Sequence, residues 1–261
     1  MFQIVLDSYD CIGKLAGPVN AVTISTASEP CVSRTSYQWL LFDADGTLFD
    51  FERAESLALR HAFERMGISY DPVYLDTYKK INQALWLMVE KGELLPGEVK
   101  VRRFELFLKA LQFSHSPTVF SENYVKCLGA CSELIDGAAE VIQVLKGKYQ
   151  LAILTNGLKD VQRNRLAGSI IRHHVSELII SEEVGFAKPA KEYFDAAFTR
   201  LGHPPKSSVL MIGDGWASDI QGAAQYGIDV CWYNPGRQTR PSNPEITREI
   251  TSLSELIAWL V

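Results

Sequence analysis

Residues 39–50, Trp-Leu-Leu-Phe-Asp-Ala-Asp-Gly-Thr-Leu-Phe-Asp, place two acidic residues directly after a short apolar run. The run Trp39–Phe42 is typical of a strand that is buried on both faces. Successive strand side chains point to opposite faces, so Asp43 and Asp45 can face the same side. Close carboxylates repel each other unless a cation relieves them, and a hard divalent cation would do so. The structural alternative is a pair of turn or helix-capping aspartates.

Similar apolar runs recur along the chain, and helix-length segments separate the later ones. The predicted strands are Trp39–Phe42, Leu151–Leu154, Leu178–Ile180, Val209–Ile212 and Val230–Tyr233. The predicted helices are Ala138–Leu145, Asp160–Leu166, Glu192–Leu201 and Ser218–Tyr226. Strands that alternate with helices form parallel βαβ units. The sequence therefore predicts an α/β fold with a doubly wound, Rossmann-like parallel sheet.

About a hundred residues separate the first two predicted strands, far more than an ordinary connection needs. Amphipathic helical patterns fill this interval at Glu52–Met66, Tyr74–Val89 and Val101–Leu111. We interpret the interval as an inserted helical cap domain at residues 52–135. The catalytic core is then expected to consist of residues 37–51 and 136–261.

Residues 1–36 differ from the rest, with few charges, many small residues and no sustained period. We expect an N-terminal extension that is disordered, or a start codon assigned too far upstream. An additional edge strand at Phe2–Leu6 is the alternative. We assign this segment no function.

The composition is that of a globular protein, with 261 residues, 47% hydrophobic, 22% charged and a formal net charge of -5. Interspersed charges argue against a nucleic-acid partner and against a polybasic membrane patch. No run approaches the ~18 apolar residues of a membrane span, and no secretory signal is recognisable. We expect no membrane partner, and a monomer or homodimer.

The five cysteines are an odd number and contain no Cys-x-x-Cys pair, which favours a reducing compartment. We therefore expect a cytoplasmic protein. Cys127 and Cys131 stand four apart on a probable helix and could share a metal. The stronger interpretation is that they are small apolar helix residues, because no other soft ligands cluster nearby.

Polar residues follow three further strands, at the edge where ligands of an open parallel sheet bind. Thr155-Asn156-Gly157 follows the second strand and offers a hydroxyl and backbone amides to an anion. Lys188 comes after the third and could neutralise a phosphoryl oxygen. Asp214 and Asp219 flank a glycine-containing turn after the fourth, which suits metal coordination with a supporting carboxylate. Taken singly, the threonine segment also fits a common turn and the lysine a solvated side chain.

Together these motifs, in this order at four strand ends, resemble the haloacid-dehalogenase-like hydrolase superfamily. The resemblance covers about residues 39–260, with a cap at the position of that superfamily's first cap type. It implies a phosphoryl-transferring member, because true dehalogenases lack the second acid, Asp45.

A closer resemblance comes from Asn82-Gln83-Ala84-Leu85-Trp86, from Arg103-Phe104 and from the run Ile180–Pro189. These segments are similar to bacterial pyrimidine nucleotidases, which remove phosphate from nucleoside 5′-monophosphates. This chain departs from that pattern at Gly46, where some relatives carry Glu, and at Gly215-Trp216, where a small polar pair is usual. Neither departure removes a catalytic carboxylate, so we expect both to bear on substrate fit more than on chemistry.

The resemblance and the residue chemistry imply one mechanism. Asp43 attacks phosphorus and forms an aspartyl-phosphate, while Asp45 protonates the leaving oxygen and then deprotonates water. Mg²⁺ is expected to be held by Asp43, the backbone carbonyl of Asp45 and Asp214, with Asp219 orienting this set. The substrate is then a small phosphate ester, a nucleoside 5′-monophosphate.

Phosphoryl oxygens are expected to contact Thr155, the amide of Asn156 and Lys188. Base recognition would fall to the cap. Trp86 could stack on a base, or it could be an aromatic residue packed between cap and core. Arg103 could meet a carbonyl or phosphate, or it could form a surface salt bridge.

Alternative functions stay open on the sequence alone. The same scaffold could serve a phosphatase for small sugar or glycolate phosphates, or a phosphomutase. A non-catalytic regulator is a different class, against which the complete acid set argues. A nicotinamide-binding protein is disfavoured, because no Gly-x-Gly-x-x-Gly follows the first strand.

Overall fold

The computed structural model of the protein describes residues 37–261. The expectations for residues 1–36, including the edge strand at Phe2–Leu6, fall outside the described residues. Between residues 37 and 261, no helix is both long and apolar enough to cross a membrane.

Six parallel strands form one sheet in the order β3-β2-β1-β4-β5-β6, which confirms the doubly wound α/β fold. The strands are β1 (Trp39–Phe42), β2 (Gln150–Thr155), β3 (Glu177–Ile180), β4 (Val209–Gly213), β5 (Asp229–Tyr233) and β6 (Arg248–Ile250). The sequence did not predict β6, because its three residues contain no apolar run. Phe42 lies beside Ile153 of β2 and Ile212 of β4, so the polar residues after these strands meet at one edge.

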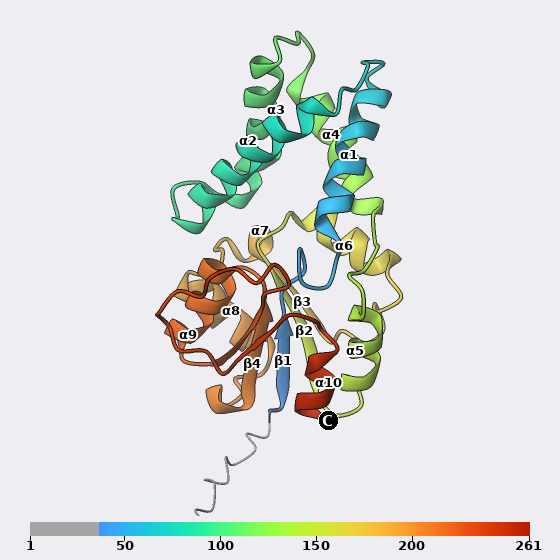
Figure 1. The fold of residues 1–261 in the computed structure, drawn as a ribbon. Helices are drawn as coiled ribbons and strands as arrows, with labels where there is room; N and C mark the ends of the chain where they lie inside the picture. The colour runs from blue at the N-terminus through green and yellow to red at the C-terminus, as the bar shows by residue number, and fades with distance from the viewer. Residues whose placement is uncertain (1–36) are drawn as a thin grey trace, which may run out of the picture. The chain divides into compact units, whose positions relative to one another are not determined.

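Helices cover both faces of the sheet, α5 (Ala138–Leu145) and α10 (Glu255–Leu260) on one and α8 (Lys191–Arg200) and α9 (Gly222–Tyr226) on the other (Figure 1). Alternate residues of β1 reach the two cores. Leu40 and Phe42 pack on the α5 face, whereas Trp39 and Leu41 pack on the α8 face. Burial on both faces explains why the strand is continuously apolar.

Four further short elements belong to the same part of the chain. They are α6 (Lys159–Gly168), α7 (Ser181–Val184), a 3₁₀ turn at Lys206–Ser208 and a π-helical turn at Trp216–Gln221. The helix expected at Ser218–Tyr226 therefore begins with a π-helical turn and becomes α-helical only at Gly222. π-Helical turns are rare in proteins, and many of those that occur lie at functional sites.

Four helices fill the long interval between β1 and α5 and lie beyond the carboxyl edge of the sheet (Figure 1). They are α1 (Phe51–Arg65), α2 (Val73–Glu90), α3 (Pro96–Ala110) and α4 (Pro117–Ala130), called the helical insert below. Phe63 packs at the centre of its core, with ring centroids 5.4 Å from Tyr74 and 5.0 Å from Phe120. Leu158 and Val161, at the start of α6, belong to the same cluster. The division into a cap at residues 52–135 and a core stays a prediction.

The chain passes between core and insert twice, and the two connecting segments pair with each other. Asp50 donates its backbone N–H to the carbonyl of Glu133 at 3.1 Å, and Ile135 donates to the carbonyl of Leu48 at 2.9 Å. An antiparallel bridge joins Phe49 to Leu134. The insert is therefore attached through a short two-stranded ribbon.

Candidate active site

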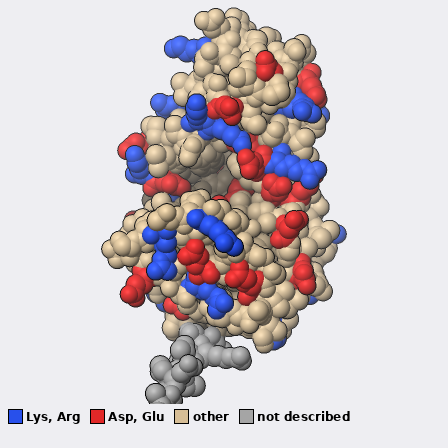
Figure 2. Space-filling model, in the orientation of Figure 1, with Lys and Arg blue, Asp and Glu red and all other residues tan. Residues whose placement is uncertain are grey.

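A cavity of about 220 Å³ lies between the carboxyl edge of the sheet and the helical insert. Figure 2 shows the hollow at this level of the molecule. Its core side is lined by Asp43, Asp45, Thr155, Lys188, Asp214 and Asp219, and its insert side by Asn82, Trp86, Glu90 and Arg103. The structure therefore brings every residue of the predicted site to one cavity.

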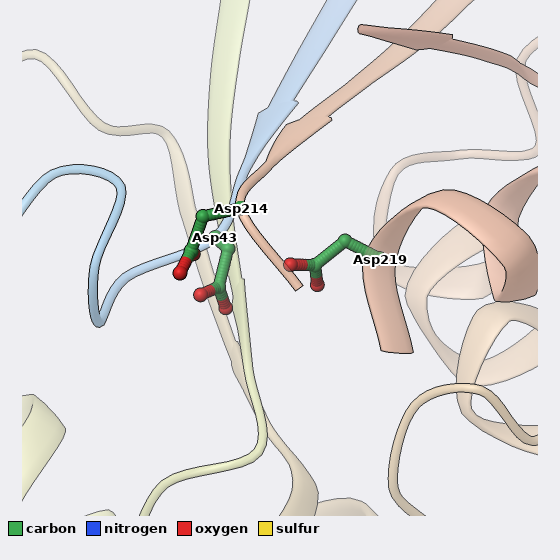
Figure 3. Close-up of side chains that lie close together, drawn as sticks. All are labelled: Asp43, Asp214 and Asp219. Atoms are coloured by element: carbon green, nitrogen blue, oxygen red, sulfur yellow. The ribbon is translucent and has the colours of Figure 1, made fainter. Parts of the chain in front are cut away.

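Three of the lining carboxylates lie close together (Figure 3). Asp43 follows β1, Asp214 follows β4, and Asp219 lies in the π-helical turn. One oxygen from each lies within 4.8 Å of the others, and in residues 37–261 no other group of three or more metal-ligating side chains comes together. Three acids from three elements at this spacing could share one cation.

Burial and mutual repulsion make these carboxylates costly to ionise. Burial, with Asp219 second, raises the pKa of Asp43 to about 7. Burial likewise raises the pKa of Asp214 to about 7, with the charge of Asp43 adding to it. The pKa of Asp219 is also raised, chiefly by its burial. A cation among them would relieve this cost.

Lys188 is buried beside the carboxylates. Its Nζ donates to Asp43 Oδ1 at 2.5 Å, to Asp219 Oδ1 at 2.6 Å and to the carbonyl of Leu154 at 2.7 Å. These contacts use all three ammonium protons. Burial alone would lower the pKa of Lys188, but Asp219 and Asp43 outweigh it and raise that pKa. The lysine is therefore held as a fixed positive charge.

The Thr155-Asn156-Gly157 segment holds Lys188 in place. The Asn156 side chain donates to the carbonyl of Lys188 at 2.9 Å and accepts from its backbone N–H at 2.8 Å. Thr155 Oγ1 accepts from the backbone N–H of Gly157 at 3.0 Å. The sequence predicted a role for the Asn156 amide only. Its side chain also orders the loop that carries the lysine.

Asp214 is oriented by the turn that follows β1. Thr47 Oγ1 donates to Asp214 Oδ1 at 2.9 Å and accepts from the Asp214 backbone N–H at 3.1 Å. Gly46 has a φ of +83°, and a Cβ there would lie 2.5 Å from Asp214 Oδ2. Glycine at position 46 is thus explained by both its backbone angle and the closeness of the carboxylate.

The side chain of Asp45 lies apart from the three-carboxylate group. Gln162 Nε2 donates to Asp45 Oδ2 at 2.6 Å, and Arg165 Nη1 donates to Oδ1. The expected metal contact of Asp45 was through its backbone carbonyl, so this orientation leaves that expectation untested. Sequence reasoning missed Gln162 and Arg165. Their signal was their spacing, since three residues apart on a helix places two polar side chains on one face.

The insert side contains a buried polar chain of three residues. Asn82 donates to Glu55 Oε1 at 3.0 Å and accepts from Arg103 Nη1 at 3.2 Å. The interpretation of Arg103 as a surface salt bridge is wrong, because only 2% of its surface is exposed and its guanidinium lies 4.7 Å from the Tyr124 ring. Burial raises the pKa of Glu55 to about 7.

Three residues that the sequence analysis singled out, Cys127, Cys131 and Trp216, make packing or supporting contacts. Cys131 Sγ donates to the carbonyl of Cys127 at 3.3 Å, and both cysteines pack in the core of the insert. Trp216 contacts the Trp232 ring, with centroids 4.8 Å apart, and Trp232 donates to the carbonyl of Asp214 at 3.0 Å. The tryptophan pair therefore supports the loop that presents Asp214.

Comparison with known proteins agrees with this geometry. The sequence model of the haloacid dehalogenase-like hydrolase family matches residues 37–227. The chain belongs to this family. Membership confirms the superfamily expected from the four strand-end motifs and the expectation that the chain is a hydrolase.

Several relatives match over most of their length. The HAD-hydrolase YfnB of Bacillus subtilis is 39% identical over 222 residues, which is 84% of this chain and 94% of that protein. Pyrimidine 5′-nucleotidase YjjG of Escherichia coli is 31% identical over 84% of this chain and 96% of its own. Pyrimidine 5′-nucleotidase PynA of Streptococcus pneumoniae is 30% identical over 86% of this chain and 95% of its own.

A solved structure shares the fold. The magnesium-bound crystal structure of YfnB has a TM-score of 0.79 and 37% identity, and the match covers 86% of this chain and 98% of that one. That orthorhombic crystal form reveals interdomain movement in YfnB.

Proposed function

We propose that this hydrolase is a Mg²⁺-dependent phosphomonoesterase that acts through an aspartyl-phosphate on Asp43, with pyrimidine nucleoside 5′-monophosphates as substrates. The observation that carries the proposal is the meeting of Asp43, Asp214 and Asp219 beside a buried lysine at the end of an open cavity. Such a floor suits a dianionic phosphoryl group, which needs positive charge around a carboxylate nucleophile.

The residues present fit a hard divalent cation. All three side chains supply carboxylate oxygens, the ligand type that Mg²⁺ prefers, and their spacing lets one ion touch them together. Burial first, and then repulsion between the carboxylates, raises the pKa values of Asp43 and Asp214 to about 7, and a cation would offset this cost of ionisation. The ion would supply charge neutralisation between the attacking carboxylate and the phosphoryl oxygens. The magnesium-bound YfnB structure supports this choice of metal.

The chain's own residues account for the remaining steps. Asp43 attacks phosphorus, and Lys188 stays within hydrogen-bond distance of the attacking carboxylate. Thr155 and the Asn156 amide bind phosphoryl oxygens at the end of β2. Asp45 gives a proton to the leaving oxygen and later takes one from the water that hydrolyses the intermediate.

The choice of a nucleotide rests on the insert side of the cavity and on the relatives. YjjG and PynA are pyrimidine 5′-nucleotidases, and both match over nearly their whole length. In this chain, Trp86 lines the cavity beside the buried polar pair Asn82 and Arg103. An aromatic face and a few fixed polar groups are what a nucleobase requires. We place this subsite in the cap domain expected at residues 52–135.

The proposal is tested by kcat/KM across a substrate panel with Mg²⁺. The panel contains UMP, dUMP, dTMP, AMP and GMP beside phosphoglycolate and glucose phosphates. We expect the pyrimidine nucleotides to be hydrolysed best. A sugar phosphate or AMP as the best substrate would refute the nucleotidase and leave the phosphatase standing, whereas conversion without phosphate release would indicate a mutase.

A further inference from the structure

One core helix holds the Asp45 carboxylate by both of its oxygens. Gln162 Nε2 donates to Oδ2 at 2.6 Å and Arg165 Nη1 donates to Oδ1. Both side chains are buried and lie one turn apart on α6. Gly157 leaves the space for the Gln162 amide, because a Cβ at position 157 would collide with it. The direction of the Asp45 side chain is therefore fixed by contacts that the three-carboxylate group does not make.

Arg165 also contacts both segments that connect core and insert. Its Nε donates to the carbonyl of Cys131 at 2.9 Å, where α4 ends. Its guanidinium lies 4.6 Å from the ring centroid of Phe49, on the outgoing segment. One arginine therefore joins the Asp45 carboxylate to the outgoing strand of the connecting ribbon and to the end of α4, just before the returning strand.

The chemistry of arginine suits this position. Its side chain is fully buried, and a buried cation is costly unless it is paired and hydrogen-bonded. The planar guanidinium can reach a carboxylate, a carbonyl and an aromatic face at once, whereas a lysine ammonium is a point charge without a stacking plane. A solvated surface arginine would need none of these partners.

We propose that Arg165, with Gln162, is a positioning residue that holds Asp45 on the leaving-group side of the cavity and ties its placement to the connecting ribbon. The inference rests on the proposed function. As Asp43 bonds to phosphorus, the ester P–O bond breaks, its electron pair goes to the leaving oxygen, and that oxygen takes the proton of Asp45. A protonated carboxyl group still offers lone pairs on both oxygens, so the two contacts are compatible with this role.

Substrates that differ only in their leaving group can distinguish a positioning role of Arg165 and Gln162 from a merely structural one. Phenyl phosphate and p-nitrophenyl phosphate have the same shape at the phosphoryl end, but phenoxide needs a proton far more than p-nitrophenoxide does. Their kcat/KM values report steps up to the phosphorylation of Asp43, so hydrolysis of the intermediate does not obscure the comparison. The variants are Arg165→Met, Arg165→Lys and Gln162→Leu. Arg163→Met is the control, since Arg163 is exposed on the same helix and pairs with Glu183.

We expect Arg165→Met to lower kcat/KM for phenyl phosphate by at least ~10²-fold, because general acid catalysis contributes at least that much to the rate. The loss for p-nitrophenyl phosphate should be much smaller. Arg165→Lys should lower kcat/KM for phenyl phosphate less than Arg165→Met does. Gln162→Leu should also lower kcat/KM more for phenyl phosphate than for p-nitrophenyl phosphate, but both losses should be smaller than in Arg165→Met. Arg163→Met should change neither rate.

Equal losses on both esters, in variants whose circular dichroism and Tm show a folded protein, would overturn this inference alone. If Arg165→Met does not fold, Gln162→Leu decides, because it removes one hydrogen bond and no charge. A wild-type protein that releases phosphate from neither ester overturns the proposed function and this inference with it.

Discussion

Lys188 on the core side of the cavity and Arg103 on the insert side differ in how their N–H donors are satisfied. On the core side, Lys188 uses all three ammonium protons, and Asp219 also accepts from the Gly215 backbone N–H at 2.9 Å. On the insert side, Arg103 makes one hydrogen bond, and its Nε and Nη2 have no hydrogen-bond partner among the described residues. Lys188 is thus held entirely by core groups, while Arg103 keeps unpaired donors that a ligand could use.

The largest effect should come from the core side. We expect Asp43→Asn to lower kcat by at least ~10³-fold, because no other group can attack phosphorus. The same change should not lower the Tm of the metal-free protein, since burial already makes the Asp43 carboxylate costly to ionise. Steady-state kinetics and thermal unfolding on the same samples check both halves. Near-normal turnover in the folded variant would remove Asp43 from the mechanism.

The metal prediction also concerns the core side. Excess EDTA should abolish phosphate release and Mg²⁺ should restore it, whereas Ca²⁺ should support it poorly because its bonds are longer and more numerous. Mg²⁺ should also raise the Tm of wild-type protein by binding the folded state alone. Asp214→Asn should reduce this rise in Tm. Its Mg²⁺ affinity should fall by more than the ~10–100-fold that is typical when a residue supporting the metal ligands is changed. Full activity in EDTA, or an unchanged Mg²⁺ response in the variant, contradicts the site.

A smaller effect is expected on the insert side. Arg103→Met should lower the ratio of kcat/KM for UMP to that for p-nitrophenyl phosphate by about ten- to hundredfold, through loss of a donor to a base carbonyl. Trp86→Ala should remove stacking worth ~1–3 kcal/mol and lower the same ratio. Arg102→Met is the matched control, because Arg102 is the exposed neighbour on α3. An unchanged ratio in both variants would show that Arg103 and Trp86 do not recognise the base.

The last effect concerns stability and pH and leaves the chemistry of the core side untouched. Burial raises the pKa of Glu55 from 4.5 to about 7, so the folded state keeps a proton that the unfolded state has lost. Between these values stability must fall as the pH rises, because the folded state binds more protons. Glu55→Gln should flatten this dependence and raise the free energy of unfolding at pH 8 by up to about 3 kcal/mol. Urea unfolding from pH 4.5 to 8 measures both; an unchanged slope would contradict the assignment.

The core side and the insert side of the cavity also differ in how well their residues could be predicted from the sequence. Asp43, Lys188 and Asp214 were predictable because each follows a strand, and parallel strands bring their carboxyl ends together whatever lies between. For Gln162 and Arg165 the sequence offered only their spacing, which puts them on one helix face, and a polar helix face is usually solvated unless its packing is known. The same holds for Arg103, whose burial depends on α4, a helix that the predicted pattern did not delimit. The three residues of β6 were missed because an edge strand needs no apolar run.

Direct detection of phosphorylated Asp43 tests the central claim most sharply. The protein is mixed with UMP and Mg²⁺, quenched in acid within milliseconds and digested, and the peptide that contains Asp43 is analysed by mass spectrometry. We expect this peptide to carry one phosphoryl group early in the reaction, to lose it as UMP is exhausted, and to carry none in Asp43→Asn. Steady phosphate release with no phosphorylated peptide, or with the group on another residue, would contradict the aspartyl-phosphate mechanism.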